Sequence, residues 1–321
     1  MPTMNVIIDC DTGVDDALAL LFALRSSACN VLGITCVGGN IPLAKVTRNT
    51  LAMVEHARRD VPVYQGAARP LLAAPITAEY AHGNDGLGDI GFPEPQGAPA
   101  TEHAVDYLIR AFMETPEPPH APPLLITLAP LTNIALALLR EPQLEERIPH
   151  IVMMAGGLTG GNTTAAAEFN VYADPEAADI IFRSRIPKTM VSLEPIRRDA
   201  LLDETEVAQI EACSNPWCWA MGRLLRRNLI QLERLSGRHA PISPPDLAAT
   251  AVALEPHLAT TENRHVAIET RGEHTRGMTL VDNRRFRHLA PNAAPPNVAV
   301  VTAINTARFQ AVVLEALLHD L

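Results

Sequence analysis

The sequence predicts a single α/β domain across residues 1 to 321, with an open, mostly parallel, Rossmann-like sheet and helices on both of its faces. Short apolar runs rich in Val, Ile and Leu alternate with segments of helical period, which is the pattern of strands buried on both faces. Hydrophobic residues make up 47% of the chain and charged residues 19%, so a sizeable core can form. Open α/β sheets are often longer than an average domain, so this length does not require a second domain.

The strands are predicted where an apolar run is short and is bounded by polar or turn residues. Five such runs lie in the first two thirds of the chain, at residues 4–10, 30–37, 123–129, 150–156 and 189–193. Further strands are predicted at residues 264–270, 278–282 and 297–304.

The helices are predicted between these strands, where the apolar spacing changes to helical period. They fall at residues 15–24, 42–58 and 130–139, and a last helix at residues 309–317 closes the chain. Two long stretches, residues 65–100 and 156–176, have no such period and are rich in Gly and in specific polar residues. Since long loops in compact domains are usually functional and ligands bind beyond the carboxyl ends of parallel strands, we expect both stretches at a ligand site.

The net charge of the chain, −10, argues against a duplex nucleic acid or an anionic membrane as partner, because those surfaces select basic patches. The only local basic cluster, Arg223, Arg226 and Arg227, is interpreted as the solvated face of a helix. The N-terminal residues lack the features of a signal peptide, and no apolar run is long enough to span a bilayer. The five scattered cysteines form no CxxC pair, which favours a reducing compartment, the cytoplasm, over a disulfide framework or a zinc site.

Four carboxylates, Asp9, Asp11, Asp15 and Asp16, lie within eight residues at the turn between the first strand and the first helix. Unit charges about 4 Å apart repel by several kcal/mol at intermediate dielectric, so this cluster requires a cation or shared protons. Carboxylates without His or Cys neighbours favour a hard ion such as Ca²⁺ or Mg²⁺. Helix capping explains one or two acids at a helix N-terminus, but not four.

A second chemistry that begins with a strand and a DxD pair is phosphoryl transfer through an aspartyl-phosphate, as in haloacid-dehalogenase-like phosphatases. In those enzymes a Thr normally follows two residues after the second Asp, whereas Gly13 stands there in this chain. The acids at positions 15 and 16 also have no role in that scheme. We therefore rank this alternative lower.

The segment IIDCDTGVDDA resembles the N-terminal signature of the inosine–uridine-preferring nucleoside hydrolase family, DTDxGxDDA after a strand. Further segments match the family in order along nearly the whole chain: GITCVGGN, HGNDGLG, PLTNIA, AEFNVYADPEAA and RGMTLVD. An ordered series of this kind is highly specific. The resemblance implies a nucleoside-hydrolase fold and a calcium-dependent ribonucleoside hydrolase that often forms dimers or tetramers.

Residue roles follow from the resemblance position by position. The calcium ligands implied are the side chains of Asp11, Asp16 and Asp246 and the backbone carbonyl of Leu128. The ribose 2′- and 3′-hydroxyls are implied to bind Asp15, Asn40 and Asn170, and the 5′-hydroxyl side is implied to meet Asn162 and Glu168. Met154 is implied to line the sugar, and His82 belongs to the matching glycine-rich loop, with its role left open.

The chain departs from the family at the position before the last metal-binding Asp, where many relatives carry His and this chain carries Pro245. Pro cannot donate a proton to the leaving base, and His239 in the preceding loop is a candidate substitute, although a lone loop histidine is more often a bystander. Trp217 or Trp219 could stack on a base, with core packing as the default. Cys10 replaces the usual Thr and is interpreted as a packing residue or weak hydrogen-bond donor, since a thiol among carboxylates is a poor thiolate.

The function predicted is hydrolysis of the N-glycosidic bond of a purine or pyrimidine ribonucleoside by a calcium-bound water, in nucleoside salvage, with Asp11 as the general base. The runner-up is a calcium-dependent nucleoside or ribose-binding protein that has lost turnover together with its proton donor. The presence of Asp11 and of the whole sugar-binding set favours the enzyme.

Overall fold

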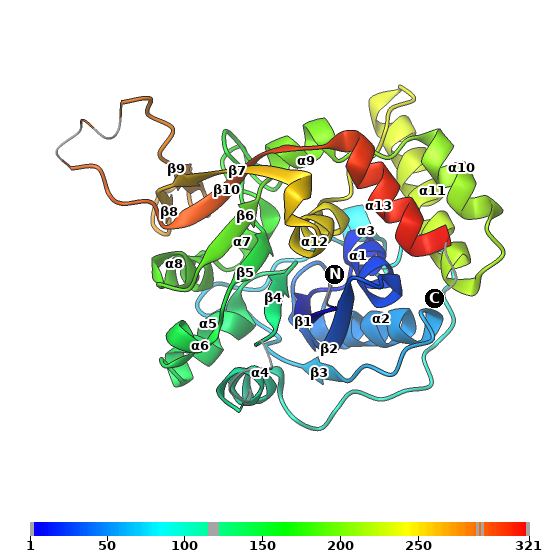
Figure 1. Ribbon diagram of the computed structural model, residues 1–321, viewed down its shortest axis with the longest axis horizontal. Coiled ribbons are helices and arrows are strands. Elements are labelled where there is room, and N and C mark those ends of the chain that lie inside the picture. The colour runs from blue at the N-terminus through cyan, green and yellow to red at the C-terminus, as the bar shows by residue number, and fades with distance from the viewer. Residues whose placement is uncertain (1–2, 115–121, 287–288, 290–291, 319–321) are drawn as a thin grey trace.

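The computed structural model describes residues 3–114, 122–286, 289 and 292–318. Eight of its strands form one sheet in the order β3-β2-β1-β4-β5-β6-β10-β7 (Figure 1). All neighbouring pairs are parallel except β10 with β7. The strands are β1 (Met4–Cys10), β2 (Cys29–Cys36), β3 (Val63–Gln65), β4 (Leu124–Thr127), β5 (Ile151–Met154), β6 (Lys188–Val191), β7 (Ala259–Arg264) and β10 (Val298–Ile304). The predicted single α/β domain with a mostly parallel sheet is confirmed.

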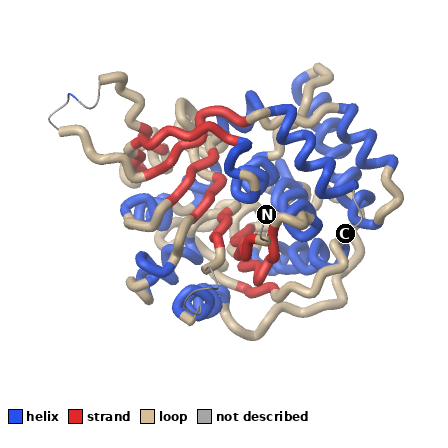
Figure 2. Tube along the Cα trace, in the orientation of Figure 1, coloured by secondary structure: helices blue, strands red, loops and turns tan. Residues whose placement is uncertain are grey.

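Helices cover both faces of the sheet, and each face has its own hydrophobic core (Figures 1 and 2). In β1 the side chains alternate between the two cores, with Val6 and Ile8 on one face and Ile7 on the other, as the period of two requires. One face is covered by α1 (Val14–Arg25), α2 (Leu43–His56), α11 (Pro216–Ser236), α12 (Pro245–Leu254) and α13 (Thr306–Leu318). The other is covered by α4 (Ala104–Met113), α5 (Thr132–Arg140) and α8 (Pro175–Arg183).

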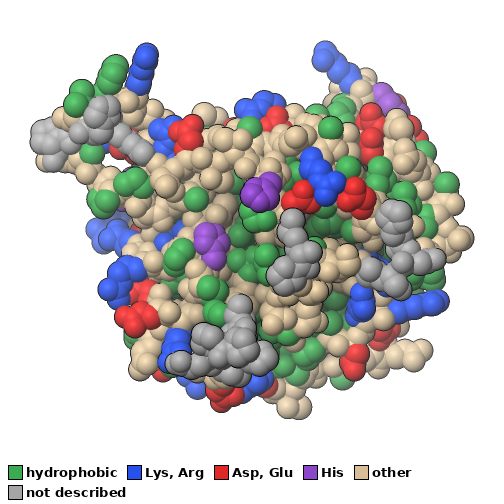
Figure 3. All heavy atoms as spheres, in the orientation of Figure 1, with side chains coloured by type: hydrophobic (Ala, Val, Ile, Leu, Met, Phe, Trp, Pro, Cys, Tyr) green, Lys and Arg blue, Asp and Glu red, His purple; other side chains and the backbone are tan. Residues whose placement is uncertain are grey.

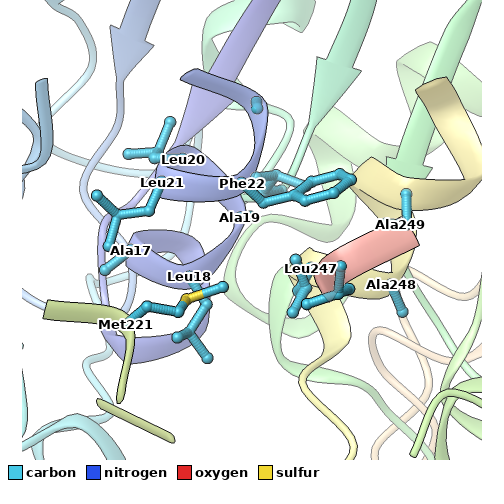
Figure 4. Close-up of a cluster of buried hydrophobic side chains, with 14 of the residues drawn as sticks. Ala17, Leu18, Ala19, Leu20, Leu21, Phe22, Met221, Leu247, Ala248 and Ala249 are labelled. Atoms are coloured by element: carbon cyan, nitrogen blue, oxygen red, sulfur yellow. The ribbon is translucent and has the colours of Figure 1, made fainter. Parts of the chain in front are cut away.

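Helix α1 is buried on nearly all sides, which explains why its sequence is apolar around the whole helix and not along one stripe. Phe22 points toward α12 on the side of Ala249, and Met221 of α11 lies beside Leu18 (Figure 4). Helix α12 is equally apolar and buried. Because α1 and α12 pack side by side, the acidic residues in their first turns come together.

The remaining elements are short. Strands β8 (Val266–Ile268) and β9 (Thr279–Val281) were expected as strands, and they form a separate antiparallel pair. The short helices are α3 (Glu79–His82), α6 (Leu144–Arg147), α7 (Phe169–Ala173), α9 (Leu193–Asp199), α10 (Glu204–Ala212) and the 3₁₀ helix η1 (Pro256–Leu258).

The surface of one face shows acidic and basic side chains in small mixed groups among hydrophobic and neutral atoms (Figure 3). Among the described residues, no helix is both long enough and apolar enough to cross a membrane.

Candidate active site

A cavity of about 230 Å³ opens where β1, β4 and β5 end, and we call it the acidic cavity. Both long loops predicted to meet at a ligand site contribute to it. Nine of the residues proposed from the sequence line it: Asp15, Asn40, His82, Leu128, Met154, Asn162, Glu168, Asn170 and Asp246. The fold therefore brings together residues that were predicted from distant segments of the sequence.

Three carboxylates in the first turns of α1 and α12 form the centre of the site. Asp15, Asp16 and Asp246 each offer an oxygen, and these oxygens all lie within 4.8 Å of one another. Asp16 accepts hydrogen bonds from the backbone N–H groups of Asp11 at 3.1 Å and Gly13 at 3.0 Å, as a helix cap does. Burial, with repulsion from Asp15, raises the pKa of Asp16 to about 7. The pKa of Asp246 is raised by burial and by the same neighbouring acids.

Asp11 lies directly after β1 and is held by Asn40 on both of its oxygens. The backbone N–H of Asn40 donates to Oδ2 at 2.6 Å, and the side-chain amide donates to Oδ1 at 3.1 Å. A Cβ at the preceding residue, Gly39, would lie 2.1 Å from Oδ2 of Asp11, so only glycine permits this approach. Burial, and the charge of Asp16, raise the pKa of Asp11 well above its usual range.

The residues at this centre fit a hard divalent cation. Their side-chain donor atoms are all oxygens, and the pKa values of Asp11, Asp16 and Asp246 are raised by burial and by repulsion between neighbouring acids. One oxygen of Asp15, Oδ1, is buried without a hydrogen-bond partner. His82 Nδ1 is 3.5 Å away, but it accepts the N–H of Val14 and burial lowers the pKa of His82, so the ring is neutral and does not pair with Asp15.

The opposite wall of the cavity is built on backbone donors around α7. Glu168 caps this helix, accepting from the N–H groups of Asn170 and Gly156 at 2.9 Å each, and burial raises the pKa of Glu168. The side-chain amide of Asn170 donates to the carbonyls of Leu128 at 2.8 Å and Met154 at 3.1 Å. This amide therefore joins the ends of β4 and β5 at the cavity.

Four of the site residues predicted from the sequence do not line the cavity: Asp11 and Asp16 are buried beside it, and Trp217 and His239 lie away from it. For the last two, the candidate roles in base stacking and proton donation need correction. The indole N–H of Trp217 donates to the carbonyl of Leu317 at 3.1 Å, and the guanidinium of Arg25 lies 3.8 Å from its ring centroid. Trp217 is therefore a core residue and not a base-stacking one. The imidazole of His239 faces Glu233 at 3.3 Å on the surface, with a side chain 66% exposed, so it is not placed to protonate a leaving group.

Two other residues singled out in the sequence also have packing contacts. Trp219 stacks on His56 and meets the edge of Phe92, and it does not line the acidic cavity. Cys10 is fully buried and accepts the hydroxyl of Thr12 at 3.3 Å, and burial raises the pKa of its thiol. These contacts match the packing role that its acidic neighbours predict.

A second cavity of about 580 Å³, which we call the adjoining cavity, shares Asp15, Ala81, His82 and Pro245 with the acidic cavity. It brings in two residues that sequence reasoning missed, Arg197 of α9 and Arg227 of α11. Arg227 was interpreted as part of a solvated face; instead it is half-buried, and its guanidinium donates to the carbonyl of Ala81 at 2.7 Å. The acidic cavity also includes Tyr80, which sequence reasoning missed and which lies two residues before the matching segment HGNDGLG.

An open, mostly parallel sheet with an acid-lined cavity at the carboxyl ends of its strands is the arrangement of an α/β enzyme that binds a small ligand at that edge. The sequence model of the inosine-uridine preferring nucleoside hydrolase family matches residues 6–311. The chain belongs to this family and is a ribonucleoside N-glycosyl hydrolase. The phosphatase alternative is therefore wrong.

Similar proteins and solved structures match this chain over nearly its whole length. The chain is 36% identical over 317 residues, 98% of each protein, to the pyrimidine-specific ribonucleoside hydrolase RihA of Salmonella gallinarum. It superposes on the plant nucleoside hydrolase PpNRh1 with a TM-score of 0.90 and 28% identity, covering 99% of this chain and 100% of that one. Superposition on the purine-preferring ribonucleoside hydrolase of Gardnerella vaginalis gives a TM-score of 0.88 with 29% identity and covers 98% of each chain.

Proposed function

We propose that the enzyme uses a calcium ion, held by Asp11, Asp16, Asp246 and the carbonyl of Leu128, to hydrolyse ribonucleosides to ribose and free base. The observation that carries this proposal is the cluster of mutually repelling carboxylates at the acidic cavity: oxygens of Asp15, Asp16 and Asp246 lie within 4.8 Å of one another, and Asp15 and Asp246 line the cavity. When bound, such a cation supplies positive charge that acidifies water and offsets the acids. Magnesium is the alternative hard ion, and a metal series distinguishes the two.

The chain's own residues then divide the chemistry. We assign Asp11 as the group that takes a proton from the attacking water, because it follows β1 among the other acids and Asn40 holds both of its oxygens in place. Asp15, Asn40 and Asn170 would hold the 2′- and 3′-hydroxyls. Asn162 and Glu168 would meet the 5′ side, beside Met154. The carboxylates and amide oxygens lining the cavity would stabilise the positive charge that develops on the sugar.

Departure of the base is the step in which this chain differs from many relatives. Pro245 cannot donate a proton, and His239 faces away. We assign His82 to the base side because it lines both cavities. Its Nδ1 accepts the N–H of Val14, so the neutral ring carries its proton on Nε2, which can donate a hydrogen bond to the leaving base.

Pyrimidine ribonucleosides are the substrates we propose first, since the relatives that are 36 to 39% identical over most of the chain are named as pyrimidine-specific enzymes. The test is release of ribose from uridine, cytidine, inosine and adenosine, with and without a chelator. We expect turnover that a chelator abolishes and that Ca²⁺ restores. Full activity of an Asp11→Ala protein would refute the assigned base.

The second candidate is a nucleoside sensor without turnover, and Pro245 is the observation in its favour. Calcium-dependent binding of uridine, measured by calorimetry with no base released over hours, would decide for the sensor. We propose further that the protein forms a homodimer or homotetramer and acts in the cytoplasm in nucleoside salvage. Its free cysteines support a reducing compartment, and light scattering and cell fractionation test the two points.

A further inference from the structure

We propose that the adjoining cavity selects ribosides whose base carries an anionic substituent, such as a ring carboxylate. This inference rests on the proposed function, because it assumes a ribose in the acidic cavity. The two cavities share Asp15, Ala81, His82 and Pro245 at their boundary. A heterocycle attached to that ribose therefore extends into the adjoining cavity, whose volume of about 580 Å³ accommodates a substituted ring.

The charge of the adjoining cavity is opposite to that of the acidic cavity. Its lining includes the guanidinium groups of Arg197 and Arg227, and its one carboxylate, Asp15, lies at the boundary with the acidic cavity. None of the salt bridges among the described residues involves Arg197 or Arg227. The adjoining cavity therefore contains two guanidinium groups without a salt bridge to a described carboxylate, in a chain with a net charge of −10.

The two arginines differ in what else they do. Arg227 donates to the carbonyl of Ala81 and lies near Asp85 and Asp89, so part of its role is to hold the loop that carries His82. Arg197 is exposed and has no hydrogen bond of its side chain among the described contacts, so structure alone gives no reason for its charge. Arg197 is therefore the sharper test of ligand recognition.

The other lining residues suit a flat ring with one charged edge. Leu232, Ile242 and Pro244 supply an apolar wall, and the amides of Asn228 and Gln231 supply neutral donors. A guanidinium matches a carboxylate with two parallel hydrogen bonds, which a carboxamide of the same size cannot reproduce. The reaction itself is unchanged: the C1′–N bond breaks, its electron pair stays on the ring nitrogen, water oxygen bonds to C1′, and the carboxylate takes no part.

Two isosteric substrate pairs test the proposal: 5-carboxyuridine against 5-carbamoyluridine, and the ribosides of pyridine-3-carboxylate and pyridine-3-carboxamide. The quantity compared is the ratio of kcat/KM, acid over amide, from chromatography of the released base. We expect the calcium-loaded protein to favour the acid by roughly tenfold or more in at least one pair, as one charge-assisted contact provides. Arg197→Gln should lower that ratio about tenfold, and Arg197→Glu should bring it below one.

The matched control is Arg198→Gln, which removes the same charge one residue away, at a side chain that pairs with Asp199 outside both cavities. It should leave the ratio unchanged. A ratio of one or less for both pairs in the parent protein, or an equal ratio in Arg197→Gln, overturns the proposal. Uridine turnover tests the proposed function separately. If no riboside is cleaved, the same acid-to-amide comparison by calorimetric binding decides between support and rejection.

Discussion

Asn40 holds both oxygens of Asp11, through its backbone N–H at 2.6 Å and its side-chain amide at 3.1 Å. The same amide donates to Asp16 at 3.1 Å, so Asn40 orients two acids of the site at once.

Asn40→Ala should lower kcat/KM for uridine by roughly ten- to a hundredfold, because Asp11 and Asp16 lose the side-chain amide that orients them, although the backbone N–H to Asp11 remains. Steady-state kinetics measures this loss. The matched control is Asn30→Ala, which breaks an exposed Asn–Asn pair far from the site and should leave kcat/KM unchanged. Equal kinetics in the two variants would show that the side chain of Asn40 does not orient these acids.

Calcium should raise the melting temperature of chelator-treated protein, because a cation relieves the repulsion among Asp15, Asp16 and Asp246. Mass action gives about 2.7 kcal/mol of stabilisation at a calcium concentration a hundred times Kd. In a thermal melt, Asp246→Asn should lose most of the calcium-dependent rise in melting temperature, whereas the control Asp60→Asn, at an exposed position, should keep it. An unchanged calcium response in Asp246→Asn would remove Asp246 from the cation site.

His239→Ala should keep kcat/KM for uridine within about twofold of the parent value, since its ring faces Glu233 on the surface. His82→Ala should lower kcat/KM by at least roughly tenfold, because it removes a wall common to both cavities and the acceptor for the N–H of Val14. Parallel kinetics of the two proteins gives the comparison. The reverse order of losses would restore His239 as the leaving-group acid.

Lys188 is a buried cation at the start of β6, and burial lowers its pKa to about 8. In the unfolded chain this pKa is near 10.5, so the folded protein gains stability from this group as pH rises between these values. Below about pH 8 the charge is buried at a cost. Lys188→Met, which removes the charge, should therefore gain more stability relative to the parent at pH 7 than at pH 10.

The difference should be on the order of 2 kcal/mol in the free energy of unfolding, measured by urea denaturation at the two pH values. The variant also loses the hydrogen bond from Lys188 to the carbonyl of Ser184, but that loss adds little pH dependence of its own. A difference between variant and parent that is the same at pH 7 and pH 10 would contradict the lowered pKa.

The buried part of the fold could be predicted because strands covered on both faces must be apolar throughout. Strand β1 was predicted with its observed bounds, and the four parallel strands that follow it in the prediction each matched to within a few residues. Strand β7 was not predicted, because its sequence ATTENR is mostly exposed at the sheet edge and carries no apolar alternation. Strands β8 and β9 were predicted, but no local signal shows that they pair apart from the main sheet.

The site residues carried by motifs could be predicted because each follows a strand end or sits in a loop that the fold must bring to the same edge. Arg197 and Arg227 could not, since their place depends on how α9 and α11 pack against that edge. The same limit applies to Trp217. A tryptophan at the start of α11 could lie in the core or line a cavity, and only its hydrogen bond to Leu317 in α13 places it in the core.

Pro244 and Pro245 stand directly before Asp246 at the start of α12. Two consecutive prolines restrict the backbone even in the unfolded chain, so little conformational entropy remains to be lost when Asp246 is set in place. Pro245, which stands where many relatives carry a proton donor, thus also restricts the backbone that carries Asp246, the acid that we propose as a cation ligand. We therefore expect an ion to bind there with little rearrangement of this segment.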